Sequence, residues 1–163
     1  MKILAIDPGN EFTAWAVLDC DDVLYHGKDS NDEFLNLMKF RIDVGDLDMA
    51  VVEMVACYGM SVGREIFETC VMIGRIEDRW SEHTNKPIMR ITRPEVKLQL
   101  CGTVRAKDAN VRAKLIDLYG PGKEAAVGVK SKPGPLYGVK GDEWAAIAVG
   151  VAWMRKNQIG GVP

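Results

Sequence analysis

The chain opens with an uninterrupted apolar run that ends in a carboxylate. Residues 3–6 are apolar, Asp7 follows them, and Pro8 and Gly9 then end the strand and turn the backbone. The pattern predicts a buried strand with Asp7 at its C-terminal end. In the sheets of α/β proteins, ligands bind at that end of the strands, so Asp7 is the first candidate for a functional side chain.

Apolar segments separated by polar turns continue the sheet. Residues 12–18 and 23–27 predict two further strands, and their short connections predict an antiparallel three-strand meander. Residues 31–41 carry apolar side chains at helical spacing and lead to an apolar strand, 49–53, which ends in Glu53. Because a crossover helix joins parallel strands, the strand at 49–53 is expected to run parallel to a neighbour.

The second half of the chain predicts more helix than strand. A long helix is expected to end at about Trp80, a fifth strand to span 87–91, and shorter helices to span 93–101 and 106–119. The expected inner face of the long helix is one helical stripe: Ile66, Phe67, Cys70, Val71 and Gly74. The sequence therefore predicts an α/β fold with a mixed five-stranded sheet, an antiparallel three-strand meander plus parallel strands, flanked by helices.

Two segments near the C-terminal end differ in composition. Residues 120–141 are rich in Gly, Pro and Lys. A segment of this length that is interrupted repeatedly by Gly and Pro predicts a mobile functional loop. Residues 142–156 form an expected helix that is apolar almost all round, which predicts a buried helix. Its first two residues, Asp142 and Glu143, are acidic.

Acidic side chains therefore stand at the ends of three separate elements: Asp7, Glu53, and the pair Asp142 and Glu143. This arrangement predicts one carboxylate cluster, and such clusters hold hard divalent cations through oxygen ligands. Each acid also has a purely structural interpretation. Asp7 would open a turn, Glu53 would pair with an arginine, and Asp142 would cap the last helix.

Composition limits the number of domains and the class of protein. The 163 residues, 47% hydrophobic and 27% charged, fit one globular domain over 1–163. The net charge of −2 hides an asymmetry, since residues 1–63 hold four basic and twelve acidic side chains and residues 64–163 hold seventeen and eleven. The basic part is compatible with a phosphate-binding face, and equally with solvated charge.

The sequence shows no signal for export and no pattern for metal binding by thiolates. The apolar run before Asp7 is too short for a signal peptide, and no stretch reaches the ~18 apolar residues of a membrane span. We therefore expect a cytoplasmic protein without membrane contact. The four cysteines have no C-x-x-C spacing, so reduced thiols are expected.

Four segments, taken in order, form a set. They are the strand-turn-strand segment 3–13, Glu53 at the end of its strand, the basic segment 96–108, and residues 142–148 at the start of the last helix. Together they resemble the RuvC-type Holliday junction resolvases of the ribonuclease-H-like superfamily. The similar segments cover most of the chain in the order and spacing of that family.

The resemblance implies a ribonuclease-H-like fold, a homodimer, and Mg²⁺- or Mn²⁺-dependent cleavage of four-way DNA junctions. Asp7, Glu53 and Asp142 would be the metal ligands. One position departs from the family pattern, because Ala145 stands where a second acid or a histidine is expected three residues after Asp142. Either Glu143 compensates from the same turn, or Asp142 acts alone, or the metal site is weakened.

Phosphodiester hydrolysis is compatible with this set of acids. Two cations ~4 Å apart can activate the attacking water, neutralise the phosphate oxygens and stabilise the leaving oxygen. Because Mg²⁺ needs only one or two carboxylates per ion, three or four acids suffice. Asp7 would bridge both ions, with Glu53 holding one and Asp142 or Glu143 holding the other.

Basic and aromatic side chains are candidates for contacts with branched DNA. The candidates for phosphate contact lie in the basic segment and in the Gly- and Pro-rich loop: Lys97, Arg105, Lys107, Lys130 and Lys132. Tyr58, in a loop just beyond Glu53, would wedge between bases at a junction. These interpretations compete with simpler ones, namely solvated lysines and a packed tyrosine.

Two other functions fit parts of the sequence. A phosphate-binding ATPase of the actin and sugar-kinase type also has a first strand that ends in Asp-x-Gly, but it needs two lobes and a second Gly-rich phosphate loop, and 163 residues provide one lobe. A branched-DNA-binding protein of the same fold, with weak or no catalysis, fits the departure at Ala145. Cleavage of a four-way junction with Mg²⁺ or Mn²⁺ would separate this second function from a nuclease.

Overall fold

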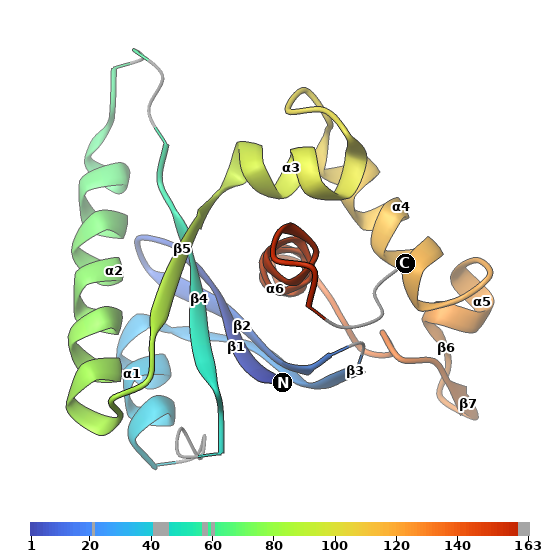
Figure 1. Cartoon of the computed structure of the whole chain (residues 1–163), viewed down its shortest axis with the longest axis horizontal. Coiled ribbons are helices and arrows are strands. Elements are labelled where there is room, and N and C mark those ends of the chain that lie inside the picture. The colour runs from blue at the N-terminus through green and yellow to red at the C-terminus, as the bar shows by residue number, and fades with distance from the viewer. Residues whose placement is uncertain (21, 41–45, 57–58, 60, 160–163) are drawn as a thin grey trace.

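The computed structural model describes residues 1–20, 22–40, 46–56, 59 and 61–159. Within them, one mixed sheet of five strands lies at the centre of the molecule (Figure 1). The strands are β1 (Lys2–Pro8), β2 (Phe12–Asp19), β3 (Asp22–Ser30), β4 (Met49–Met54) and β5 (Ile88–Thr92). Their order is β3-β2-β1-β4-β5; β1 to β3 are antiparallel, whereas β4 is parallel to β1 and to β5. The predicted fold class is confirmed.

Helices cover both faces of this sheet (Figure 1). They are α1 (Asn31–Phe40), α2 (Arg64–His83), α3 (Arg93–Cys101), α4 (Asp108–Tyr119), the short α5 (Lys123–Ala126) and α6 (Glu143–Lys156). On one face lie α1 and α2, and on the other lies α6, with α3 and α4 packed over it (Figure 1). None of the helices in the described ranges is long and apolar enough to span a membrane.

The sheet separates two apolar cores. Successive side chains of a strand point to opposite faces, so Leu4 and Ile6 of β1 pack with α1 and α2, whereas Ile3 and Ala5 pack with α6. All four are fully buried. Burial on both faces explains why β1 is apolar without alternation, as expected for a central strand with a parallel neighbour.

The last helix, α6, is buried almost all round, as its composition predicts. It lies very close to the sheet at Gly150, where an added Cβ would come within 2.2 Å of Leu18 Cδ1 and 3.0 Å of Ala5 Cβ. A side chain at this position would force Leu18 to move, so the glycine permits the close approach of α6 to β1 and β2.

The prediction for the inner face of α2 is wrong. Its buried residues are Met72, Ile73, Ile76 and Trp80. In the predicted stripe, Phe67 and Val71 are 61% and 65% exposed, and Cys70 and Gly74 are also exposed. Both sets have helical spacing, so periodicity alone does not tell which one faces the sheet.

The Gly- and Pro-rich segment 120–141 contains regular structure. It forms α5 and a small antiparallel hairpin of β6 (Gly128–Val129) and β7 (Lys132–Pro133). Ala126 and Leu136 are fully buried, and the Leu136 N–H donates a 2.8 Å hydrogen bond to the Ala126 carbonyl. The segment is thus anchored in the core beside α6, and its mobility stays a prediction.

Candidate active site

Asp7 lies at the end of β1, immediately before a turn that other residues hold in place. The Gly9 N–H donates to the Phe12 carbonyl at 2.9 Å, and the Asn31 side chain donates to the Gly9 carbonyl at 3.1 Å. Ile6 of β1 pairs with Val52 of the parallel strand β4. The next residue of each strand, Asp7 and Glu53, therefore lies at the same edge of the sheet. The first two predicted acids are therefore brought together by strand register.

Asp7 has a strongly perturbed titration. Burial, and then the negative charge of Glu53, raise its pKa from 3.8 to about 7, and the charge of Asp142 adds to this effect. The positive charges of Arg93 and Lys28 act in the opposite direction. The three acids from β1, β4 and the start of α6 thus form one electrostatic group, together with two basic residues that sequence reasoning did not single out.

Glu53 is held by a basic side chain from the neighbouring strand–helix junction. Arg93 Nη1 donates to Glu53 Oε2 at 3.1 Å, and its Nη2 donates to Asp108 Oδ1 at 3.0 Å. Lys97 Nζ lies 3.5 Å from the same Asp108 oxygen. Burial raises the pKa of Glu53, and Arg93 counteracts this. The structural interpretation of Glu53, an ion pair with an arginine, is confirmed as a contact.

The local sequence explains why Arg93 stands at this point. Glu95 accepts hydrogen bonds from the Thr92 N–H at 2.8 Å and from the Thr92 hydroxyl at 2.7 Å, and Pro94 occupies the first turn. This capping arrangement starts α3 directly at the end of β5. Arg93 is therefore fixed at the first position of α3, within hydrogen-bond distance of Glu53.

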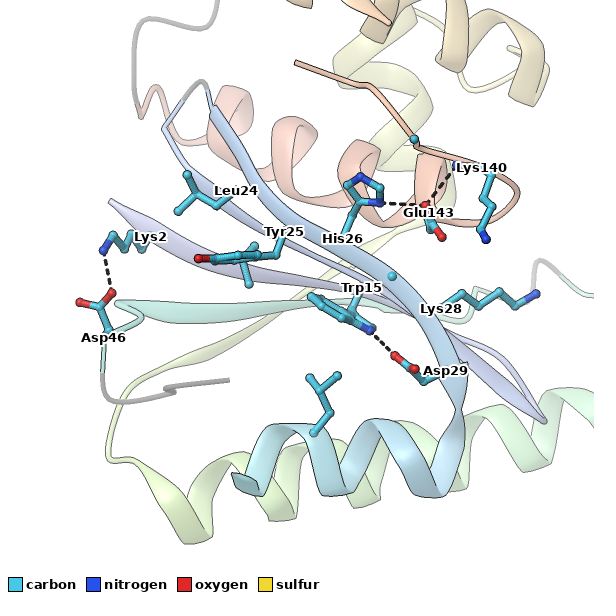
Figure 2. A pocket seen from close by; sticks show the side chains of 14 residues that line it. Lys2, Trp15, Leu24, Tyr25, His26, Lys28, Asp29, Asp46, Lys140 and Glu143 are labelled. Atoms are coloured by element: carbon cyan, nitrogen blue, oxygen red, sulfur yellow. Dashed lines mark hydrogen bonds and ion pairs between the residues drawn. The ribbon is translucent and has the colours of Figure 1, made fainter. Parts of the chain in front are cut away.

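Asp142 and Glu143 are adjacent in sequence and have different surroundings. Asp142 Oδ2 lies 2.6 Å from Lys28 Nζ, its side chain is 60% exposed, and it makes no capping hydrogen bond to α6. Glu143 is buried, pairs with His26 Nδ1 at 2.8 Å and accepts the Lys140 N–H at 3.1 Å (Figure 2). Asp142 occupies the N-cap position of α6, as predicted, although its side chain makes no capping hydrogen bond, whereas Glu143 is engaged by His26 and by the backbone of Lys140.

The side-chain partners of Asp142 and Glu143 both lie on β3. His26 and Lys28 are alternate residues, so they project from the same face of the strand and reach successive residues at the start of α6. They border a hollow of about 820 Å³ along β3 (Figure 2). The sequence interpretation ended this strand at Gly27, whereas β3 continues to Ser30, and for that reason Lys28 was missed.

The predicted DNA-contact residues fall into two places. Lys97 lies on α3 beside Asp108, and the exposed Arg105 and Lys107 lie between α3 and α4. Lys130 and Lys132 are exposed at the β6–β7 hairpin. Tyr58, the predicted wedge, lies outside the described residues.

The acids fit an oxygen-coordinated divalent cation, although they are not arranged around one. Among the described residues, no three His, Cys, Asp or Glu side chains are close enough to ligate a single ion. Glu53 is paired with Arg93 and Asp142 with Lys28, while burial, and then the negative charge of Glu53, raise the pKa of Asp7. A cation at this place would favour the ionised form of Asp7, and it would compete with Arg93 and Lys28 for the other two acids.

Solved structures with the same arrangement of elements were found, although no family model and no curated protein sequence matches the chain. RuvC from Thermus thermophilus aligns with a TM-score of 0.67 at 16% identity over 97% of this chain and 96% of that one. The same protein in complex with a Holliday junction substrate gives 0.66 at 16% identity over 96% of each chain. The Fowlpox virus resolvase in complex with Holliday junction DNA gives 0.59 at 14% identity over 96% and 99%. The chain therefore has the ribonuclease-H-like fold of Holliday junction resolvases.

Proposed function

We propose that this protein is a metal-dependent, structure-selective endonuclease that resolves Holliday junctions by hydrolysing DNA phosphodiester bonds. The observation that carries the proposal is the convergence of Asp7, Glu53 and Asp142 at one edge of the sheet, where the pKa of Asp7 is raised by burial and by the other two acids. The fold that this chain shares with junction resolvases supports the proposal. In this chain the three acids lie at the carboxyl ends of β1 and β4 and at the start of α6.

Asp7, Glu53 and Asp142 would hold Mg²⁺ or Mn²⁺, with Asp7 shared between two ions. Bound there, the ions would activate a water and neutralise charge on the phosphate. Asp142 is the better candidate for the third ligand, because it acts electrostatically on Asp7 and its partner Lys28 is exposed. Glu143 would contribute through position, since its contacts with His26 and the Lys140 N–H hold the start of α6.

Phosphate groups of the junction would be bound by the basic side chains beside the acids and on the hairpin. Lys97, Arg105 and Lys107 would contact the strand that is cut, because they lie on or between α3 and α4, next to Asp108 and Arg93. Lys130 and Lys132 would contact a neighbouring arm of the junction. Tyr58 is retained as a proposed wedge between bases.

A homodimer would form through the exposed stripe of α2, defined by Phe67, Cys70, Val71 and Gly74. Phe67 and Val71 expose most of their apolar surface, and a Cβ added at Gly74 would meet no described atom within 4 Å. A two-fold axis through this stripe would place the same four residues of two helices against each other. Two active sites related by that axis would suit symmetric cutting of two strands.

Cysteine cross-linking tests this interface. A short bis-maleimide should join two chains through Cys70, and Cys70→Ser should prevent it, whereas Cys101→Ser, which removes a half-buried thiol elsewhere, should not. Val71→Asp should convert the dimer to monomers in sedimentation. A Val71→Asp protein that sediments as the wild type does would rule out this interface.

Cleavage of a synthetic four-way junction is the test of the proposed activity. Wild-type protein with Mg²⁺ or Mn²⁺ should cut the junction at paired positions and leave a linear duplex of the same sequence intact. A second candidate, a branched-DNA-binding protein with little catalysis, is favoured by Ala145 and by the basic partners that occupy Glu53 and Asp142. Tight junction binding without cleavage at any concentration of either metal would establish this second function instead.

A further inference from the structure

Arg93 lies among the acids with two acceptors of different kinds. Its side chain is 28% exposed; one acceptor, Glu53, is 15% exposed and belongs to the acidic site, and the other, Asp108, is 70% exposed and lies outside it. Separate nitrogens make the two contacts, Nη1 to Glu53 and Nη2 to Asp108. The contact to Glu53 can therefore break while the contact to Asp108 remains.

We propose that Arg93 is a displaceable counter-ion of the metal site. A divalent cation and the Arg93 guanidinium compete for the Glu53 carboxylate, and Asp108 retains the guanidinium when the cation has taken Glu53. This inference rests on the proposed metal site, and it assigns positioning roles to two residues that are not metal ligands.

The cost of burying charge explains why such a counter-ion is needed. An ionised carboxylate removed from water without a partner is strongly destabilising, so Glu53 stays ionised without a bound cation only where a positive charge accompanies it. Arg93 supplies that charge from a backbone position fixed by the Thr92–Glu95 capping arrangement. Displacing it would leave a half-buried guanidinium unpaired, and Asp108 prevents this because Lys97 and the start of α4 hold it within reach.

The competition predicts a gain in metal affinity when Arg93 is removed. Calorimetric titration of metal-free protein with Mn²⁺, without DNA, should show Arg93→Ala binding at least about fivefold more tightly than wild type, the lower end of ordinary coupling between two sites. Structural damage would weaken binding, so a gain is not explained by misfolding, and the double variant below separates displacement from simple charge removal. Arg90→Ala is the matched control, because it removes the same charge from an exposed pair with Glu77 on α2 and should leave the affinity unchanged.

Asp108 should act in the opposite direction and only through Arg93. Asp108→Asn removes the negative charge of the alternative acceptor, so Arg93 stays on Glu53 and Mn²⁺ should bind more weakly than to wild type. In the double variant Arg93→Ala, Asp108→Asn, the affinity should equal that of Arg93→Ala alone, because nothing remains to be displaced. Asp108→Asn also provides a test if Arg93→Ala does not fold.

The outcomes separate this inference from the proposed nuclease. An Arg93→Ala protein that is folded and binds Mn²⁺ no more tightly than wild type would overturn the counter-ion role, as would an additive effect of the two substitutions. If Arg93→Ala binds Mn²⁺ more tightly and the wild-type protein cuts no junction, the counter-ion role is supported and the nuclease is refuted. Absence of Mn²⁺ binding in every variant would refute both.

Discussion

The two sides of the acidic site use the same kind of contact at different depths. On the β4–α3 side, Glu53 and Arg93 are 15% and 28% exposed, and the pair continues into Asp108. On the β3–α6 side, Asp142 and Lys28 are 60% and 39% exposed, and the Lys28 ammonium also lies 5.2 Å from the centre of the Phe12 ring. Asp7 lies between the two pairs and is influenced by all four charges.

Burial decides what each contact costs to open. An exposed ion pair contributes about 0–1 kcal/mol, so Asp142 can leave Lys28 with little loss. The half-buried pair of Glu53 and Arg93 is different, because separating it leaves an uncompensated charge in a region with little water. The α6 side is therefore the easily rearranged half of the site, and the β4–α3 side is the half that needs an alternative partner for its cation.

The largest effect is expected from a substitution of Asp7, which lies between the two sides of the site. Asp7→Asn should abolish metal-dependent cleavage of a four-way junction and leave junction binding largely intact, since the basic side chains that contact phosphates remain. Cleavage gels and gel-shift titrations with the same preparation measure both. Metal-dependent nicking by pure Asp7→Asn protein would show that Asp7 is not the shared ligand.

The next effect distinguishes the two acids of the α6 side. Asp142→Asn should slow cleavage by at least about tenfold, ~1.4 kcal/mol of barrier, and Glu143→Gln should cost less because Glu143 acts through His26. Ala145→Asp should tighten metal binding, because residues 142 and 145 share a helix face. Cleavage rates at several Mn²⁺ concentrations measure all three. A fully active Asp142→Asn beside an inactive Glu143→Gln would mean that Glu143 is the ligand.

A smaller effect concerns the stability of the metal-free protein. Asp7 has a pKa of about 7 when folded and 3.8 as its ordinary value, so between these values the folded state binds the extra proton and stability falls as pH rises. Asp7→Asn has no such proton. Its unfolding temperature relative to wild type should therefore be higher at about pH 8 than at about pH 5, measured with a chelator. Parallel pH profiles would contradict the raised pKa.

The smallest effect sharpens the DNA-contact role of the β4–α3 side. Lys97→Ala and Lys107→Ala should each flatten the slope of log affinity against log salt by about one unit, because each phosphate contact releases close to one counterion. Arg75→Ala, which removes a charge paired with Asp32 on the opposite face of the sheet, should leave the slope unchanged. Wild-type affinity that does not depend on salt would exclude phosphate contacts as its source.

Much of the fold was predictable because strand periodicity and short turns act locally. The meander, the crossover to β4 and the buried α6 follow from apolar runs of the right length. The orientation of α2 was not predictable, because the helix has two apolar stripes. Only the tertiary structure shows that Ile73 and Trp80 face the sheet, while Phe67 and Val71 do not.

The acids of the site were predictable and their partners were not. Asp7 and Glu53 lie near the ends of β1 and β4, and Asp142 lies at the start of α6, which are local signals. The pair of Glu143 with His26 joins residues 117 positions apart, and nothing in either neighbourhood specifies it. Arg93 was visible as the start of a helix, but its choice of Glu53 and Asp108 depends on how β5 and α4 are placed in space.

The position of α6 also has a consequence for the timing of synthesis. Asp7 and Glu53 are synthesised first, and Asp142 and α6 follow 89 residues after Glu53 (142 minus 53). Until α6 docks at Gly150, the sheet face lined by Ile3 and Ala5 has no cover. A nascent chain therefore carries two of the three acids without the third, and we expect the proposed nuclease activity to arise in the same step that buries the last helix.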